Sequence, residues 1–190
     1  MRQRVWLFIP FVIIFTLFLS CSVEQGGVKT SIQSQDDADD CAVIISSTWN
    51  EPIYAGSSSH TYSNEREDGF EKGYAISNGT YYYNYVYPTR TRRYTNVTVQ
   101  FYDYADDADF SSMTGTITVH GTLSYSESTQ YYSGGWTVTG TIDLSPPTNT
   151  DFDSWKFQCT VTFNFYYVSP WDYYGTITSS GDVYNVDSIF

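Results

Sequence analysis

The sequence predicts an all-β fold, an antiparallel meander of about eight strands that forms a closed or partly closed barrel. A two-sheet β-sandwich is the alternative. Aromatic residues make up 19% of the 190 residues, with 19 Tyr and 12 Phe, and aromatic and β-branched side chains fit the pleated, half-buried surface of a sheet. Apolar residues occupy every second position from 155 to 167, which is typical of a strand with one buried face. Short connections favour antiparallel neighbours, and closing the sheet would remove its edges.

Alternation and turn residues divide the domain into nine predicted strand segments: 42–47, 72–77, 80–87, 94–104, 114–125, 135–145, 155–168, 172–179 and 182–187. The first is the apolar run that follows Cys41. Asn78-Gly79 predicts a two-residue hairpin, because both central residues of such a turn have positive φ. No helix of useful length is predicted.

Segments 115–125 and 135–145 predict one hairpin with a definite register. Pairing Ile117 with Leu144 brings Gly121 opposite Gly140. A shift of one residue would turn the apolar side chains to the solvent.

The first twenty residues have the features of an export signal. A basic start with Arg2 and Arg4 precedes an apolar run over 5–19, and the small residue Ser20 stands before Cys21. Such a sequence predicts a secretory signal peptide. The run is shorter than the roughly 20 apolar residues of a membrane-spanning helix and contains Pro10.

Leu17-Phe18-Leu19-Ser20-Cys21 resembles the lipobox of bacterial lipoproteins, most closely the relaxed form found in spirochaetes. It departs from the usual pattern at Phe18, where that pattern has Leu. The resemblance implies cleavage before Cys21, lipid on this cysteine and attachment to a membrane. Ser22 lacks the Asp associated with inner-membrane retention, which favours the outer membrane or cell surface. Ordinary cleavage and an uncleaved anchor remain alternatives.

The chain therefore divides into a signal peptide over 1–20, a lipidated flexible tether over 21–40 and one all-β domain over 41–190. Gly, Ser, Gln and Asp dominate the tether, a composition typical of flexible linkers. Its four aspartates at 36, 37, 39 and 40 indicate a solvated linker rather than a cation site. The net charge is −12, and so acidic a surface excludes nucleic acid as a partner.

Cys41 and Cys159 remain once Cys21 is assigned to the lipid. An even pair of cysteines in an exported protein predicts a disulfide. The alternative is two buried thiols that act as small apolar side chains.

The residues of an enzyme site are missing, so we expect neither catalysis nor a cofactor. His60 and His120 are the only histidines, and no nucleophile, phosphate or dinucleotide motif is present. An acidic cluster offers a weak candidate for a Ca²⁺ site, with a solvated loop as the favoured interpretation. Its members are Asp103, Asp106, Asp107 and Asp109.

The tyrosines are the strongest candidate for function. A tyrosine combines a flat apolar ring with a polar tip, which suits a surface that binds sugar rings or another protein. The candidate surface consists of Tyr81, Tyr83, Tyr85, Tyr87, Tyr102 and Tyr104. The only basic cluster of the mature chain is expected in a hairpin loop, either solvated or facing an acidic partner or the domain's own carboxylates: Arg90, Arg92 and Arg93.

These features predict a non-enzymatic, lipid-anchored envelope protein that binds a carbohydrate or protein partner through its tyrosine-rich surface. Two alternatives remain. One is a structural or host-facing surface lipoprotein without a small ligand, and the other is a hydrolase of envelope or environmental polysaccharide that uses paired carboxylates.

Overall fold

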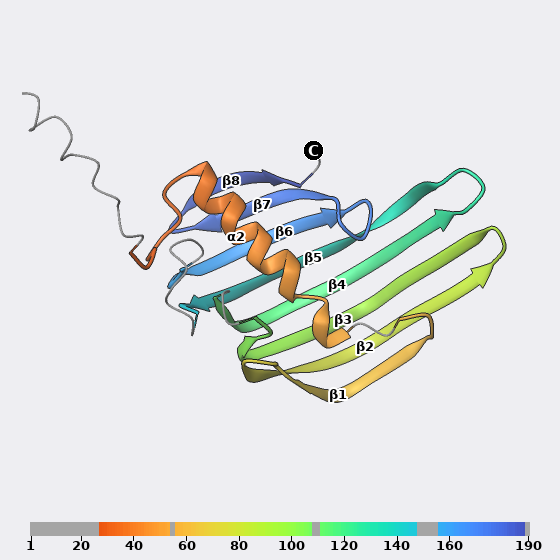
Figure 1. Ribbon diagram of the computed structural model, residues 1–190, viewed down its shortest axis with the longest axis horizontal. Coiled ribbons are helices and arrows are strands. Elements are labelled where there is room, and N and C mark those ends of the chain that lie inside the picture. Colours follow the sequence, from red (N-terminus) through yellow and green to blue (C-terminus); the bar gives the residue numbers. More distant parts are fainter. Residues whose placement is uncertain (1–26, 54–55, 108–110, 148–155, 189–190) are drawn as a thin grey trace, which may run out of the picture.

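The structure, a computed structural model, describes residues 27–53, 56–107, 111–147 and 156–188. Its strands form one antiparallel sheet in which spatial order follows chain order, from β1 to β8 (Figure 1). The predicted antiparallel meander is therefore confirmed. The strands are β1 (His60–Asp68), β2 (Lys72–Val86), β3 (Thr89–Ala105), β4 (Ser112–Ser126), β5 (Tyr131–Ser145), β6 (Thr160–Tyr167), β7 (Tyr173–Ser179) and β8 (Asp182–Asp187).

One helix, α2 (Gln35–Thr48), crosses a face of this sheet and is followed by the short 3₁₀ helix η1 (Glu51–Ile53) (Figure 1). The core lies between this helix and the sheet. The helix contributes Cys41, Ile44 and Ile45, each fully buried. Alternate residues of the strands complete the core, as in β6, where Val161, Phe163, Phe165 and Tyr167 are buried.

The predicted barrel and the alternative sandwich are not confirmed. The sheet is not closed by hydrogen bonds, since β1 and β8 lie at its two ends, and the described strands all belong to this one sheet. The helix supplies the physical reason. It covers an apolar face that would otherwise need closure or a second sheet to exclude water.

The predicted strand over 42–47 is wrong, and so is the absence of a helix. Residues 35–40, assigned to the flexible tether, form the first part of α2. Ser34 caps the helix, because its hydroxyl accepts a hydrogen bond from the Asp37 backbone N–H at 3.1 Å. The acidic side chains of Asp36 and Asp37 in the first turn also stabilise the helix through their favourable interaction with its dipole. Lys29 forms ion pairs with Asp37 and Asp40 at 2.7 and 3.3 Å. The aspartate-rich segment that resembles a linker is therefore the ordered first part of a helix.

Two predicted turns also differ from the structure. The chain runs straight through Asn78-Gly79 within β2, where the pairing with β3 shifts and Gly79 has a φ of 121°. A glycine at a strand irregularity thus replaces the predicted hairpin turn. The actual turn is Tyr87-Pro88, which places Arg90, Arg92 and Arg93 within β3 rather than in a loop. β1 was not predicted, because its largely charged and polar sequence lacks alternation.

The hairpin over β4 and β5 forms as predicted, but its register is wrong by four residues. Gly121 lies opposite Trp136, and Gly140 lies opposite Ile117. A shift by an even number keeps every apolar side chain on the core face, so the alternation alone could not exclude it. Each glycine thus faces a large side chain, Trp136 or Ile117. The predicted register would instead have placed the two glycines opposite each other.

No helix among the described residues is long and apolar enough to cross a membrane. The predicted signal peptide over 1–20 and the predicted lipidation site Cys21 lie outside the described residues.

Candidate binding pocket

The core face of the sheet ends in a row of buried aromatic side chains that lie side by side on neighbouring strands. In register these are Tyr81, Tyr94, Trp136 and Tyr167, with Gly121 between Tyr94 and Trp136. Trp49, at the end of α2, covers this row, with its ring 5.3 Å from that of Tyr167 and 6.3 Å from that of Tyr94. Its indole N–H donates to the Tyr167 hydroxyl at 2.8 Å, and burial raises the pKa of Tyr167. The aromatic row therefore closes the core.

The same face continues for two further cross-strand rows beyond this point. The first row is Tyr83, Arg92, Leu123 and Gly134, and the second is Tyr85, Arg90, Tyr125 and Tyr132. These rows have the parity of the core residues, so their side chains point to the face that α2 covers elsewhere. The strands β2 to β5 thus extend past the helix and expose a part of their inner face, as their long hairpins in Figure 1 show.

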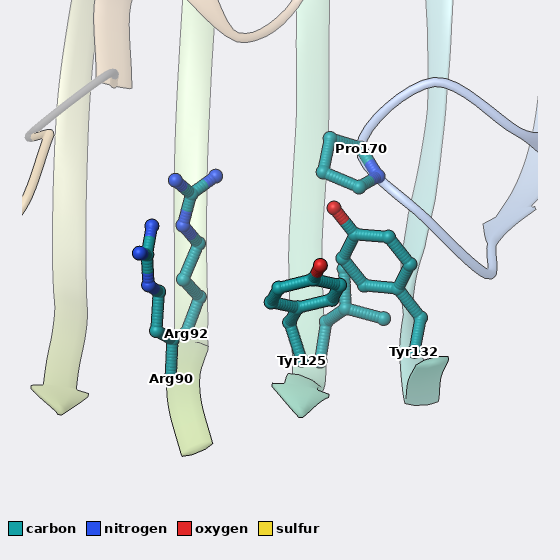
Figure 2. Close-up of a pocket in the computed structure, with 6 residues that line it drawn as sticks. Arg90, Arg92, Tyr125, Tyr132 and Pro170 are labelled. Atoms are coloured by element: carbon teal, nitrogen blue, oxygen red, sulfur yellow. The ribbon is translucent and has the colours of Figure 1, made fainter. Parts of the chain in front are cut away.

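A pocket of about 250 Å³ lies on this exposed part (Figure 2). Its walls come from three neighbouring strands and from the loop between β6 and β7. The lining residues are Arg90, Arg92, Leu123, Tyr125, Tyr132 and Pro170. In Figure 2 the side chains of the two arginines and the two tyrosines point in the same direction. Pro170 lies beyond the hydroxyl ends of the two tyrosines. Pockets for drug-sized ligands measure roughly 300–1,000 Å³, so this one suits a small group.

Arg90 is held at one side of the pocket by Glu127. Its Nε and a terminal nitrogen donate to the same carboxylate oxygen at 2.8 and 2.5 Å, and the Tyr85 hydroxyl donates to the other oxygen at 3.1 Å. The hydrogen bond from Arg90 lowers the pKa of Glu127 below its ordinary value of 4.5. The carboxylate is therefore ionised at neutral pH and neutralises the charge of Arg90.

Arg92 lies one row deeper and is half-buried between Tyr83 and Leu123. Within the described parts of the chain, its guanidinium has no hydrogen bond, ion pair or ring contact. A half-buried positive charge without an acidic partner is uncommon, because partial burial weakens its hydration. Arg92 therefore gives the pocket a net positive charge.

The rings of Tyr125 and Tyr132 are 4.8 Å apart and inclined by 41°. No described residue forms a hydrogen bond with either hydroxyl group. The loop beyond them is fixed by Ser169, whose hydroxyl accepts the backbone N–H of Asp172 at 2.9 Å and donates to its carboxylate at 2.7 Å. Two free hydroxyls and a fixed loop make a preorganised wall.

A second hollow of about 310 Å³ lies on the other side of Tyr132. Its lining is mixed, with polar residues such as Gln130 and Asp172 beside Tyr131 and Val168. Because Tyr132 belongs to both hollows, they form neighbouring parts of one surface. We call the two together the Tyr–Arg surface.

The structure divides the six predicted tyrosines among four environments. Tyr81 and Tyr104 are buried in the core. Tyr83 and Tyr85 flank the pocket on β2. Tyr102 faces the opposite side of the sheet, where its ring stacks on Tyr74 at 4.6 Å. The remaining residue, Tyr87, is exposed at the β2–β3 turn. The six therefore do not form one surface.

The other predicted sites stay dispersed. Cys41 and Cys159 are free thiols, so the predicted disulfide is not observed. Asp103 pairs with Lys72 at 3.0 Å, and Asp106 accepts the backbone N–H of Phe70 at 3.2 Å. No metal-binding group of three His, Cys, Asp or Glu side chains occurs in the described ranges; Asp109 lies outside them. His60 pairs with Glu65 on β1, and His120 is exposed on β4.

The sequence interpretation missed Tyr125, Tyr132 and Pro170 as pocket residues. The sequence indicated them in part, because Tyr125 faces the same side of its strand as the apolar Leu123, and Tyr132 the same side as Trp136.

Comparison of the chain with protein-family models, with curated proteins and with solved structures finds no match.

Proposed function

We propose that this chain is an exported, lipid-anchored envelope protein whose sheet domain binds a saccharide without catalysing a reaction. The observation that carries the proposal is the uncovered inner face, where a small pocket combines tyrosine rings with unpaired polar groups. Flat aromatic rings pack against the apolar faces of sugars, and hydroxyl and guanidinium groups hydrogen-bond with sugar oxygens. The neighbouring hollow provides room for a second sugar unit.

The position of the pocket fits an anchor at Cys21. Near the start of the described chain, Lys29 bonds with the backbone on both sides of Phe157, just before β6. Leu144, beside Cys159 at that end, is twelve residue steps from Tyr132 along β5. At about 3.3 Å a step this corresponds to roughly 40 Å. An anchored domain would thus hold the pocket away from the membrane.

Substitution of Tyr132 tests the binding function. On an array of neutral and acidic oligosaccharides, we expect the full-length protein in detergent micelles to bind at least one class of saccharide. Tyr132→Ala removes a ring shared by both hollows and should weaken this binding at least tenfold, the effect of losing about 1.4 kcal/mol.

Tyr87→Ala is the matched control, since Tyr87 is exposed at the same end of the sheet but lines neither hollow. It should bind within twofold of the wild type. Circular dichroism would confirm that both variants are folded. An array on which the wild type binds no saccharide, or on which Tyr132→Ala binds as strongly as the wild type, would refute the proposal.

The anchor has a separate test. Cys21→Ala should abolish incorporation of radiolabelled palmitate in cells and leave the signal peptide uncleaved, because the lipid-bearing thiol is lost. Cys41→Ala, which removes a cysteine buried in the core, should still be labelled. Equal labelling of the wild type and Cys21→Ala would exclude lipidation at this residue.

A further inference from the structure

We propose that the ligand is an acidic saccharide of low charge density, whose carboxylate is bound by Arg92 while a neutral sugar unit occupies the neighbouring hollow. This inference rests on the proposed saccharide-binding function and names the class of ligand. Three observations carry it: the unpaired guanidinium of Arg92, the neutralised charge of Arg90, and the acidic group in the second hollow.

The first observation concerns the other basic residues of the domain. Four of them, Lys29, Arg66, Lys72 and Arg90, each have a carboxylate within 3.0 Å. Arg93, on the opposite face of the sheet, lies over the ring of Tyr82 instead. Acidic residues outnumber Lys and Arg by 21 to 9 in the chain, so carboxylates are abundant. Arg92 nevertheless has none among the described residues, although it lies only one row from Arg90, which pairs with Glu127. Its guanidinium is thus available to a carboxylate that the described part of the chain does not supply.

The second observation explains why Glu127 does not fill this role. Both of its oxygens are occupied, one by Arg90 and the other by the Tyr85 hydroxyl. Its backbone N–H also donates to the Pro88 carbonyl at 2.8 Å, which fixes the two hairpin turns against each other. The carboxylate is therefore held away from Arg92, and the pocket keeps one uncompensated positive charge.

The chemistry of the walls selects a carboxylate attached to a sugar. The planar guanidinium matches a carboxylate with two parallel hydrogen bonds. The unpartnered hydroxyls of Tyr125 and Tyr132 can donate to and accept from sugar hydroxyls. The volume of about 250 Å³ suits one such unit.

The third observation limits the charge of the ligand. Among the described residues, the lining of the second hollow includes Asp172 and no basic side chain, so it repels a second carboxylate. The net charge of −12 likewise opposes a densely charged polyanion. A saccharide in which acidic and neutral units alternate meets both conditions, whereas a heavily sulfated one does not.

The test titrates the full-length protein with three tetrasaccharides by isothermal calorimetry. One alternates glucuronic acid with N-acetylglucosamine, one contains N-acetylglucosamine only, and one is a sulfated heparin fragment. We expect the alternating tetrasaccharide to bind at least tenfold more tightly than either of the others. Tetraglutamate, which carries carboxylates without sugar rings, should also bind at least tenfold more weakly.

Arg92→Gln should reduce binding of the alternating tetrasaccharide at least tenfold and leave binding of the neutral one unchanged. Arg93→Gln is the matched control, because it removes the same charge from the adjacent position of β3 but from the opposite face, where Arg93 lies over Tyr82. It should bind within twofold of the wild type. Arg92→Lys keeps the charge but loses the planar guanidinium with its two parallel donors, so it should give intermediate affinity. Thermal midpoints would verify folding.

Equal affinity for the neutral and alternating tetrasaccharides, or equal losses in the two glutamine variants, would overturn the assignment of Arg92. The saccharide-binding function would then still stand if Tyr132→Ala abolished binding of the neutral sugar. Tight binding of tetraglutamate would instead indicate an acidic peptide and reject this inference. If no saccharide bound at all, the proposed function itself would fail.

Discussion

Ile45→Asp should unfold the domain or lower its free energy of unfolding by about 3–5 kcal/mol. Ile45 belongs to α2 and is fully buried in the core. The substitution removes a large apolar side chain and places an unpaired charge there. Urea denaturation followed by circular dichroism would measure the loss.

Val43→Asp is the informative comparison, because Val43 is 41% exposed on the other side of the same helix. Its effect should stay below about 1 kcal/mol. In a strand, residues 43 and 45 would share a face, and both substitutions would be severe. Similar losses in the two variants would therefore contradict the helix.

Gly121→Val should strongly destabilise the sheet, with a loss of about 3 kcal/mol or more. Gly121 has a φ of 136°, and a Cβ atom there would lie 2.3 Å from the carbonyl oxygen of Gly135 and 2.9 Å from the Trp136 Cα. The variant thus combines backbone strain with a clash against the neighbouring strand. The thermal midpoint of unfolding would report the loss.

Gly181→Ala separates these two contributions. Gly181 has a φ of 94°, but a Cβ atom there would meet nothing within 4 Å. We therefore expect only the cost of the unusual backbone conformation, about 1–2 kcal/mol. A smaller loss for Gly121→Val than for Gly181→Ala would mean that β4 and β5 do not pair in the register described above.

The sheet was predictable where one face is buried. In β5 and β6, alternation identifies both the strands and the residues that face the core, such as Val138 and Phe165. The helix was not predictable in the same way. Its apolar run from Cys41 to Ile45 resembles a short buried strand, and periodicity cannot distinguish the two over so few residues. The capping hydroxyl of Ser34 was the better indicator.

The Tyr–Arg surface was partly predictable. Tyr83 and Tyr85 flank it on β2 without lining either hollow, and the four other tyrosines of the predicted set lie elsewhere. Which tyrosines remain exposed depends on where α2 ends over the sheet, and the sequence interpretation contained no helix. The role of Arg92 depends on the pairing of Arg90 with Glu127, a contact across 37 positions that no local pattern reveals.

The open sheet has a consequence for how molecules of this protein meet one another. An unpaired strand can add a strand of a second molecule, and charged edge residues oppose this. β1 carries Glu65, Glu67 and Asp68, all exposed, and β8 begins and ends with Asp182 and Asp187. At the N-terminus of α2, the side-chain amide of Gln35 also donates a hydrogen bond to the backbone carbonyl of Asn185 on β8 at 2.5 Å. Repulsion between the two acidic edges thus opposes the joining of neighbouring molecules into one continuous sheet.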